Sequence, residues 1–359
     1  MPLEKDTRRL RLGILGCGPI SQIAHFEAAR KARNIDLYAI CDRADDLRER
    51  MGALHRPRCV YRDHRELLAD PQVEAVLIGV ADAFHVPLAL DAIAAGKHVL
   101  IEKPLGVTVE ECQTLTDLVR KSGLHLQVGN NRRFDPGIAF AHRFVREEMG
   151  APLSFKAWYW DSVYRYTMTD NLQPVVELSQ SAVRPPGNPK ANKATYFILT
   201  HASHLVDTAR WLGGEIVGVR ARLREQFGAY CWFVEVEFAH GGLGHLDLTI
   251  PIRGDFEEGF QIQGEFGSVQ GRVLLPWFHK AAHVECFSSR DRQFHRLLGE
   301  DAFTYKLQLE HFADVILNGT PPRGATSADG TAAMRALVAI SRSTVSGEAV
   351  RLADVSGGV

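Results

Sequence analysis

The sequence predicts an α/β protein: an N-terminal Rossmann domain, which is a doubly wound parallel sheet, followed by a C-terminal α+β domain built on a large, mostly antiparallel open sheet. Between Leu10 and about Gly129, short apolar runs alternate with helical patterns, as in βαβ units. After Gly150 the apolar residues recur with a period of two, which is typical of antiparallel strands. Because 359 residues exceed the usual size of one domain, we expect domains at residues 1–129 and 130–359.

The elements of the first domain can be placed in order. Glycine marks two helix ends, at Gly96 and Gly123, because it adopts the left-handed conformation that closes a helix. Strands are expected at 11–16, 37–41, 73–80, 98–101 and 124–129, and helices beginning at Ser21, His85 and Val109.

The second domain is expected to contain strands at 154–161, 215–223, 230–238, 242–250, 259–264 and 283–287, and helices at 200–212, 305–317 and 330–345. The stretch Ser179–Lys193 contains three prolines, shows no periodicity and is longer than a typical connection. It is predicted to be a mobile lid, a subunit-contact arm or a plain surface loop.

Composition excludes several classes of function. The chain is 45% hydrophobic and 24% charged with a net charge of −1, so it has no basic field for nucleic acid, and a small-molecule partner is expected. No apolar run reaches the roughly 18 residues of a membrane span. The six cysteines are scattered without a CxxC pair, and the N-terminus lacks a convincing export signal, so a cytoplasmic protein is predicted.

A glycine-rich turn follows the first predicted strand. Gly16 permits the sharp turn, Gly18 permits close approach of a pyrophosphate, and Pro19 and Ile20 lead into the helix, whose N-terminus favours negative charge. Ser21 replaces the third glycine of the dinucleotide fingerprint. This segment therefore predicts a dinucleotide site.

Cofactor preference is indicated by Asp42, which ends the second strand about 24 residues beyond Gly18. A carboxylate there would accept hydrogen bonds from the ribose hydroxyls of NAD and repel the 2′-phosphate of NADP. The adjacent Arg43 could pair with that phosphate, so NAD is predicted and NADP is kept as an alternative.

Lys103 follows the apolar strand 98–101 within the sequence Glu102-Lys103-Pro104. The carboxyl ends of strands in a doubly wound sheet are where ligands bind. An ammonium beside a hydroxyl stabilises the alkoxide that develops when the carbon loses hydride. Lys103 is therefore a candidate catalytic residue, although lysines after strands are usually solvated.

The predicted helix at 200–212 carries the second catalytic candidate. Thr200, His204 and Asp207 share one face, and His204 could accept a hydroxyl proton near neutral pH. The alternative is a core histidine hydrogen-bonded to Asp207 or Thr208. His201 and His204 could also be metal ligands, but the sequence has no HExxH motif, second His/Cys pair or carboxylate cluster, so no metal site is predicted.

Substrate contacts are expected from two segments. Aromatic residues and nearby hydrogen-bonding groups cluster on and just after the strand that enters the second domain and suit a polyhydroxylated ligand, with Trp158, Asp161 and Arg165 as candidates. Arg132 and Arg133 lie where the chain leaves the parallel sheet. One, taken here as Arg133, is expected to reach the cofactor or a substrate oxygen, and the other to be solvated.

These motifs resemble the glucose–fructose oxidoreductase, inositol dehydrogenase and rhizopine catabolism (Gfo/Idh/MocA) family. The resemblance spans nearly the whole chain and rests on the glycine turn, Asp42, Ala81–His85, Ala95–Leu105, Asn131–Phe134 and Ser203–Asp207. It implies a Rossmann domain joined to a mostly antiparallel domain whose open sheet forms contacts in homodimers or homotetramers. It assigns Lys103 and His204 to catalysis, and it places Asp82, His85 and Glu102 along the nicotinamide side of the cofactor.

One position departs from the family pattern. Many polyol dehydrogenases of the family have aspartate four residues before the histidine, where this chain has Thr200. Either Thr200 only binds substrate or His201 compensates for the missing carboxylate.

We therefore expect an NAD-dependent dehydrogenase that oxidises a secondary hydroxyl of an inositol, sugar or related cyclic polyol. The alternatives are an NAD-retaining glycoside hydrolase that uses transient oxidation and a non-catalytic nucleotide-sensing regulator. The joint presence of Lys103 and His204 favours an enzyme.

Overall fold

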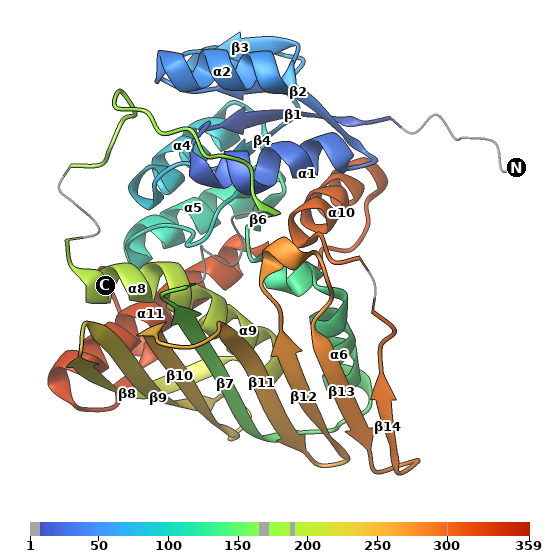
Figure 1. Ribbon diagram of the computed structural model, residues 1–359, viewed down its shortest axis with the longest axis vertical. Helices are drawn as coiled ribbons and strands as arrows, with labels where there is room; N and C mark the ends of the chain where they lie inside the picture. The colour runs from blue at the N-terminus through green and yellow to red at the C-terminus, as the bar shows by residue number, and fades with distance from the viewer. Residues whose placement is uncertain (1–7, 165–171, 187–190, 300) are drawn as a thin grey trace, which may run out of the picture.

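The computed structural model describes residues 8–164, 172–186, 191–299 and 301–359. Arg165, one of the expected substrate residues, lies outside these ranges. Figure 1 shows two sheets with helices between and around them. No helix in the described ranges combines the length and apolar character that crossing a bilayer requires.

The first sheet has seven strands in the order β15-β6-β5-β4-β1-β2-β3. All neighbouring pairs are parallel except β15 with β6. The central strands are buried on both faces, which explains their continuous apolar runs. The chain order reverses at β1, which lies between β2 and β4, so a ligand crevice is expected at its carboxyl end. The strands are β1 Leu10–Leu15, β2 Ile35–Cys41, β3 Cys59–Tyr61, β4 Ala75–Ile78, β5 His98–Ile101, β6 Leu126–Val128 and β15 Ala325–Thr326.

Helices flank this sheet. The helix expected from Ser21 begins with one π-helical turn, a feature common near functional sites, before it continues as an α-helix. The Thr108 side chain caps the start of α5, and Gly123, with a φ of 70°, ends it. The elements are η1 Ser21–His25, α1 Phe26–Lys31, α2 Asp45–His55, α3 His64–Ala69, η2 Asp82–Phe84, α4 His85–Ala94 and α5 Val109–Ser122.

The second sheet has nine strands in the order β14-β13-β12-β11-β7-β10-β9-β8-β16. It is mostly antiparallel, as expected, but β7 and β10 are parallel. The strands are β7 Pro152–Ser162, β8 Ile216–Gln226, β9 Ala229–Phe238, β10 Leu243–Ile252, β11 Glu257–Gly264, β12 Gly267–Val273, β13 His283–Ser288, β14 Gln293–Arg296 and β16 Val350–Arg351.

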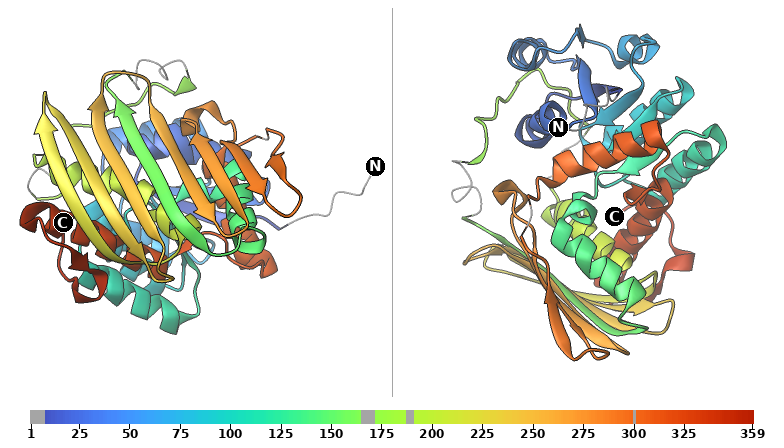
Figure 2. Two further views of the ribbon diagram at one scale, coloured as in Figure 1. Left: turned by 90° about the horizontal axis from the view of Figure 1, so that it is seen from below. Right: turned by 90° about the vertical axis from the view of Figure 1, so that its right-hand side faces the viewer.

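Helices cover only one face of the second sheet, and the other face is open (Figure 2). Alternate residues of β9 are buried and exposed, which is the physical origin of the period-two pattern. The helices and short turns of this part of the chain are η3 Asn131–Phe134, α6 Pro136–Glu147, α8 Lys193–Phe197, η5 Ile198–Ala202, α9 Ser203–Gly213, η6 Pro276–Phe278, α10 Thr304–Asn318, α11 Ser327–Ser346 and η7 Leu352–Asp354.

Part of the C-terminal sequence returns to the first sheet. Strand β15 pairs with β6, and α10 packs on α1 through the buried residues Leu309 and Phe312. A division at residue 129 therefore separates these elements from the sheet that they complete. Sequence periodicity located α10 and α11 correctly, but it could not show which sheet each would join.

Candidate cofactor and catalytic site

A cavity of about 640 Å³ opens at the carboxyl ends of β1, β2 and β4. Six residues expected to bind the cofactor line it: Gly16, Gly18, Pro19, Ile20, Asp42 and Arg43. The other residues that line the cavity are mainly apolar, and most of them were not singled out from the sequence. They include Leu47, His64, Val80, Phe84, Pro87, Leu88, Asp91, Ala182 and Val183.

The two turn glycines meet different steric demands. Gly16 has a φ of 98°, and a Cβ there would lie 2.7 Å from the carbonyl oxygen of Gly79. A Cβ on Gly18 would meet nothing within 4 Å and would project into open space. Ser21, in the place of the third glycine, is completely buried against Gly79. The turn is thus a cradle that leaves room for a pyrophosphate at Gly18.

Asp42 is held in place by the backbone. Its Oδ2 accepts a hydrogen bond from the amide of Cys17 at 2.7 Å, and its Oδ1 accepts one from the amide of Ala44 at 2.8 Å. Each oxygen keeps a second lone pair for a ligand hydroxyl. A carboxylate fixed in this way at the cavity wall fits the adenosine ribose of NAD and disfavours a 2′-phosphate.

Lys103 connects the two domains. Its Nζ donates a hydrogen bond to the carbonyl of Thr200 at 3.0 Å, one turn before His204 on α9. The same carbonyl accepts from the Ser203 hydroxyl at 3.2 Å. The π-helical turn η5 presents this segment to the end of β5. The contact brings Lys103 to the helical turn that precedes His204, four residues before this second catalytic candidate.

Glu102 lies beneath Lys103 and is buried. One carboxylate oxygen contacts Nε2 of His25 at 3.0 Å, and the other accepts from the Lys103 amide at 3.2 Å. Burial acts to raise the pKa of Glu102, but the contact with His25 and the positive charge of Lys103 outweigh it, so the pKa is lowered. The ionised Glu102 fixes the backbone that carries Lys103.

The expected cofactor contacts of His85 and Glu102 need correction. His85 is completely buried, and its ring nitrogens face the carbonyls of Pro104 at 2.7 Å and Val80 at 3.2 Å. A side chain with no accessible surface cannot touch a ligand without rearrangement, so His85 holds together the loops after β4 and β5. Glu102 is only 6% exposed and likewise acts by holding the Lys103 backbone. Asp82 begins the short turn η2 and is partly exposed.

Aromatic rings surround the two histidines of the α9 segment. Tyr159 lies on the helix-facing side of β7. Its ring is parallel to the His204 ring, with 6.2 Å between the ring centroids, and edge-on to the His201 ring, with 5.6 Å between the centroids. Asp207, one of the two alternative partners expected for His204, pairs with Arg133.

His201 takes part in a chain of short contacts. The Thr200 hydroxyl donates to the Tyr196 carbonyl at 2.6 Å, so it must accept from Nδ1 of His201, which lies 2.7 Å away. Nε2 of His201 lies 3.2 Å from the Asp161 carboxylate. The Thr200 hydroxyl is thus engaged within the protein, and His201 links it to the Asp161 carboxylate.

Arg132 and Arg133 are both buried, so the expectation that one is solvated is wrong. Arg132 pairs with Glu258, with Nε 3.1 Å from Oε1. Arg133 makes a bidentate contact with Asp207, at 2.7 and 3.0 Å, and also reaches Asp329. Arg133 therefore joins elements of the fold and is not the substrate contact that was expected.

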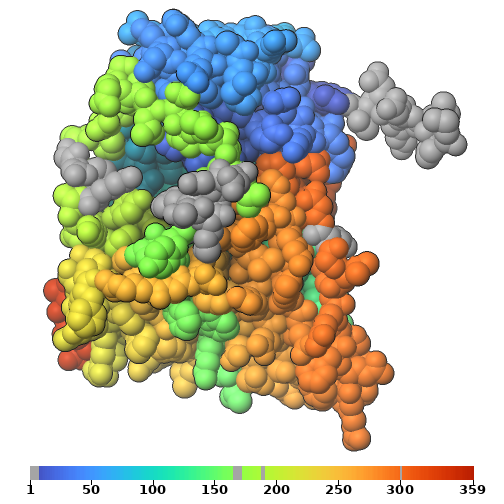
Figure 3. All heavy atoms as spheres, viewed as in Figure 1, coloured from blue at the N-terminus to red at the C-terminus, as the bar shows by residue number. Residues whose placement is uncertain are grey.

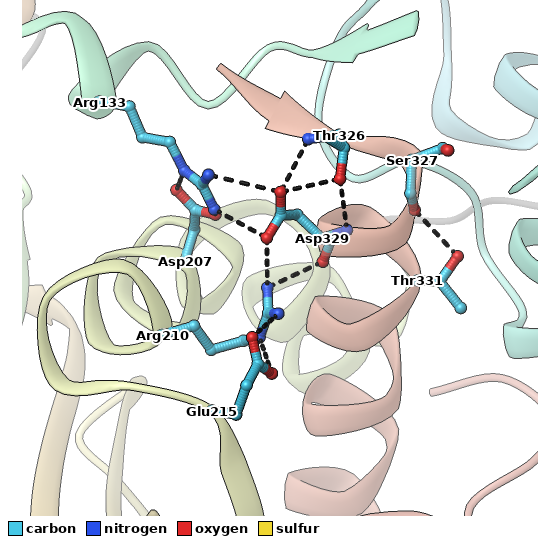
Figure 4. Close-up of polar contacts among 8 residues, drawn as sticks. All are labelled: Arg133, Asp207, Arg210, Glu215, Thr326, Ser327, Asp329 and Thr331. Atoms are coloured by element: carbon cyan, nitrogen blue, oxygen red, sulfur yellow. Dashed lines mark hydrogen bonds and ion pairs between the residues drawn. The ribbon is translucent and has the colours of Figure 1, made fainter. Parts of the chain in front are cut away.

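Figure 4 shows how this ionic network continues. Asp329 lies between Arg133 and Arg210 and accepts a hydrogen bond from the Thr326 amide at 2.8 Å. Burial raises the pKa of Asp329, but the two arginines and Thr326 more than compensate and lower it. The network ties α9, which carries His204, to η3 and to the start of α11.

Trp158 also needs correction as a substrate residue. It lies on the opposite face of β7 from Tyr159 and Asp161, over Gly259 on the open side of the sheet. Its neighbour Asp161 does reach the site, through His201. Among the residues described, no group of three His, Cys, Asp or Glu side chains is arranged to hold a metal ion.

Two family matches cover most of the chain. Residues 10–130 match the oxidoreductase family (Gfo/Idh/MocA) with an NAD-binding Rossmann fold, and residues 188–352 match its C-terminal alpha/beta domain. The chain belongs to this Gfo/Idh/MocA oxidoreductase family. The predicted family, fold class and NAD cofactor are thereby confirmed, and the protein is an NAD-binding oxidoreductase.

Individual relatives are distant. Inositol 2-dehydrogenase of Rubrobacter xylanophilus is 26% identical over 92% of this chain and 90% of its own length. scyllo-Inositol 2-dehydrogenase (NAD(+)) of Bacillus subtilis is 26% identical over 96% of both chains. A solved levoglucosan dehydrogenase in complex with NADH has a TM-score of 0.76 at 22% identity, covering 96% of this chain and 99% of that chain. At that identity the structural likeness supports the fold alone.

Proposed function

We propose that this protein is an NAD-dependent dehydrogenase that oxidises a secondary hydroxyl of an inositol, sugar or related cyclic polyol to a ketone, reversibly. The inositol dehydrogenases among its relatives support this substrate class. The observation that carries the proposal is the contact between Lys103 Nζ and the Thr200 carbonyl, which brings a primary amine from one domain to η5, the helical turn that leads into the helix bearing His204.

The chemistry divides between these groups. Bound NAD+ supplies the acceptor for the hydride that leaves the carbinol carbon. The Lys103 ammonium stabilises the negative charge that develops on the carbinol oxygen, and His204 accepts the hydroxyl proton. The ionised Glu102 holds the Lys103 backbone, while the buried network at Asp207 holds the helix that carries His204.

His201 and Asp161 fit the position left by the missing aspartate. His201 contacts the Thr200 hydroxyl at 2.7 Å, and Asp161 lies 3.2 Å from the other ring nitrogen of His201. We propose that this pair hydrogen-bonds a second hydroxyl of the substrate, which suits a polyol better than a simple alcohol. Thr200 then acts by orienting His201.

The open face of the second sheet is proposed to join copies of the chain. Phe233 is 52% exposed there and its ring lies edge-on to His245, while Leu243 is 63% exposed. Light scattering should give a dimer or tetramer, and Phe233→Asp should shift it toward monomer. A monomeric wild type would rule out this arrangement.

A screen of inositols, monosaccharides and glycosides with NAD+ and NADP+, followed by NADH absorbance, tests the activity. Lys103→Ala should abolish turnover while NAD+ still binds, and His204→Gln should lower the rate by about 10²-fold or more. Lys121→Ala and His295→Gln, on α5 and β14, are the matched controls. Near wild-type turnover in Lys103→Ala would remove this residue from the mechanism. A glycoside cleaved without net NADH release would identify a hydrolase instead.

A further inference from the structure

One segment of the second domain crosses onto the first. Residues Glu177–Val183, called here the strap, lie on the surface of the Rossmann domain, far from the strands that precede and follow them in sequence (Figures 1 and 3). Ala182 and Val183 form part of the wall of the cofactor cavity, together with Gly18 and Asp42. The cavity is therefore built from both domains.

The first anchor of the strap is Gln22, which is buried in the turn after the glycine loop. Its Oε1 accepts a hydrogen bond from the Glu177 amide at 2.8 Å, and its Nε2 donates to the Glu177 carbonyl at 3.0 Å and to the Cys17 carbonyl at 2.8 Å. One side chain thus pairs with both backbone groups of a strap residue and with the cofactor-binding turn itself. The strap and that turn are joined through one amide.

The second anchor is Asp46, which lies in the first turn of α2. The Ser179 hydroxyl, on a side chain that is 6% exposed, donates to Oδ1 of Asp46 at 2.7 Å, and Ser181 donates to the same oxygen at 3.3 Å. Arg50 adds an ion pair with Glu177 at 2.6 Å. The hydrogen bond from Ser179 lowers the pKa of Asp46, so the carboxylate is in the charged form that accepts both hydroxyls.

We propose that the strap is part of the NAD site: Ala182 and Val183 cover the bound dinucleotide, and NAD(H) leaves only when the contacts to Gln22 and Asp46 open. A dinucleotide that occupies the cavity along Gly18 and Asp42 meets these two apolar side chains as one wall. The residues of the first domain hold the cofactor, and the strap controls how quickly it is exchanged. NADH therefore dissociates more slowly than it would from the same Rossmann domain without the strap.

This inference is tested without any substrate, so its outcome is independent of the proposed polyol chemistry. NADH is bound to the purified full chain, chased with excess NAD+ and followed by fluorescence in a stopped-flow instrument. The double variant Ser179→Ala/Ser181→Ala removes both hydroxyls that hold Asp46 and leaves the Rossmann domain intact. Its NADH dissociation rate should rise at least tenfold, whereas Gln180→Ala, an exposed position in the same strap, should match the wild type.

A second variant tests contact with the cofactor itself. Val183 is half-exposed, so Val183→Asp should fold, but it places a carboxylate on the cavity wall beside a phosphate-bearing ligand. NADH affinity should fall at least tenfold while the melting temperature of the cofactor-free protein stays unchanged. An unaltered dissociation rate in the double serine variant, or unaltered affinity in Val183→Asp, would overturn the inference.

Discussion

Alanine at Gly16 and alanine at Gly18 should have opposite effects on stability. At Gly16 the new Cβ would lie 2.7 Å from the Gly79 carbonyl oxygen, on a backbone with a φ of 98°. Positive φ costs a non-glycine residue about 1–2 kcal/mol, and the overlap adds to it, so Gly16→Ala should lose at least about 2 kcal/mol. Gly18 has no positive φ and no atom within 4 Å of the new Cβ, so Gly18→Ala should gain about 0.4–1 kcal/mol.

Although Gly18→Ala should stabilise the cofactor-free protein, NAD+ should stabilise this variant less than it stabilises the wild type. At 100 times its Kd, NAD+ stabilises the wild type by about 2.7 kcal/mol. If the methyl of Gly18→Ala keeps the pyrophosphate away from the turn and raises Kd tenfold, the same NAD+ concentration gives only about 1.4 kcal/mol. Urea denaturation of the wild type and of both variants, each with and without NAD+, measures these changes in unfolding free energy. A Gly18→Ala variant that is stabilised by NAD+ as strongly as the wild type would refute the placement of the pyrophosphate at this turn.

Two further predictions concern the buried ionic groups and histidines. Arg133→Met leaves the buried Asp207 carboxylate without its bidentate partner and should lower the free energy of unfolding in urea by about 3–5 kcal/mol. The double variant Arg133→Met/Asp207→Leu should recover most of this loss. Equal losses in the two variants would argue against an isolated buried charge as the cause. Burial lowers the pKa of both His125 and His142 to about 4, so the unfolded chain binds more protons between pH 6.5 and pH 4. Stability should therefore fall with falling pH across that window, by up to about 1.4 kcal/mol per pH unit for each histidine, and His142→Gln should flatten the profile.

Local sequence chemistry predicted the elements well where one face of a strand or helix is buried. The strands around β9 alternate because one side of their sheet packs on helices, and the helices α10 and α11 were found within a few residues of their bounds. Strand β12 was missed because its sequence is rich in glycine and polar residues, so its pattern is weak. Strand β15 is only two residues long and carries no pattern at all.

The site was predictable where its residues are contiguous in sequence. The glycine turn needs only a strand, two glycines and a helix, so Gly16 and Gly18 were placed at the cavity from spacing alone. Partners from distant segments were not predictable in this way. Arg133 had the sequence character of a ligand-binding cation, yet Asp207 and Asp329 surround it, because burying this charge requires carboxylates that only the packing of three helical segments supplies.

The sequence by itself determined the two kinds of sheet and the dinucleotide turn, since these depend on hydrophobic period and on the backbone freedom of a few residues. Only the tertiary structure decided that Lys103 meets the segment of Thr200, that His201 contacts Asp161, and that two strap residues line the cofactor cavity. Those contacts join segments separated by tens to more than a hundred residues. Their geometry depends on how the two sheets and their helices pack, and a local sequence pattern does not show which distant segments come together.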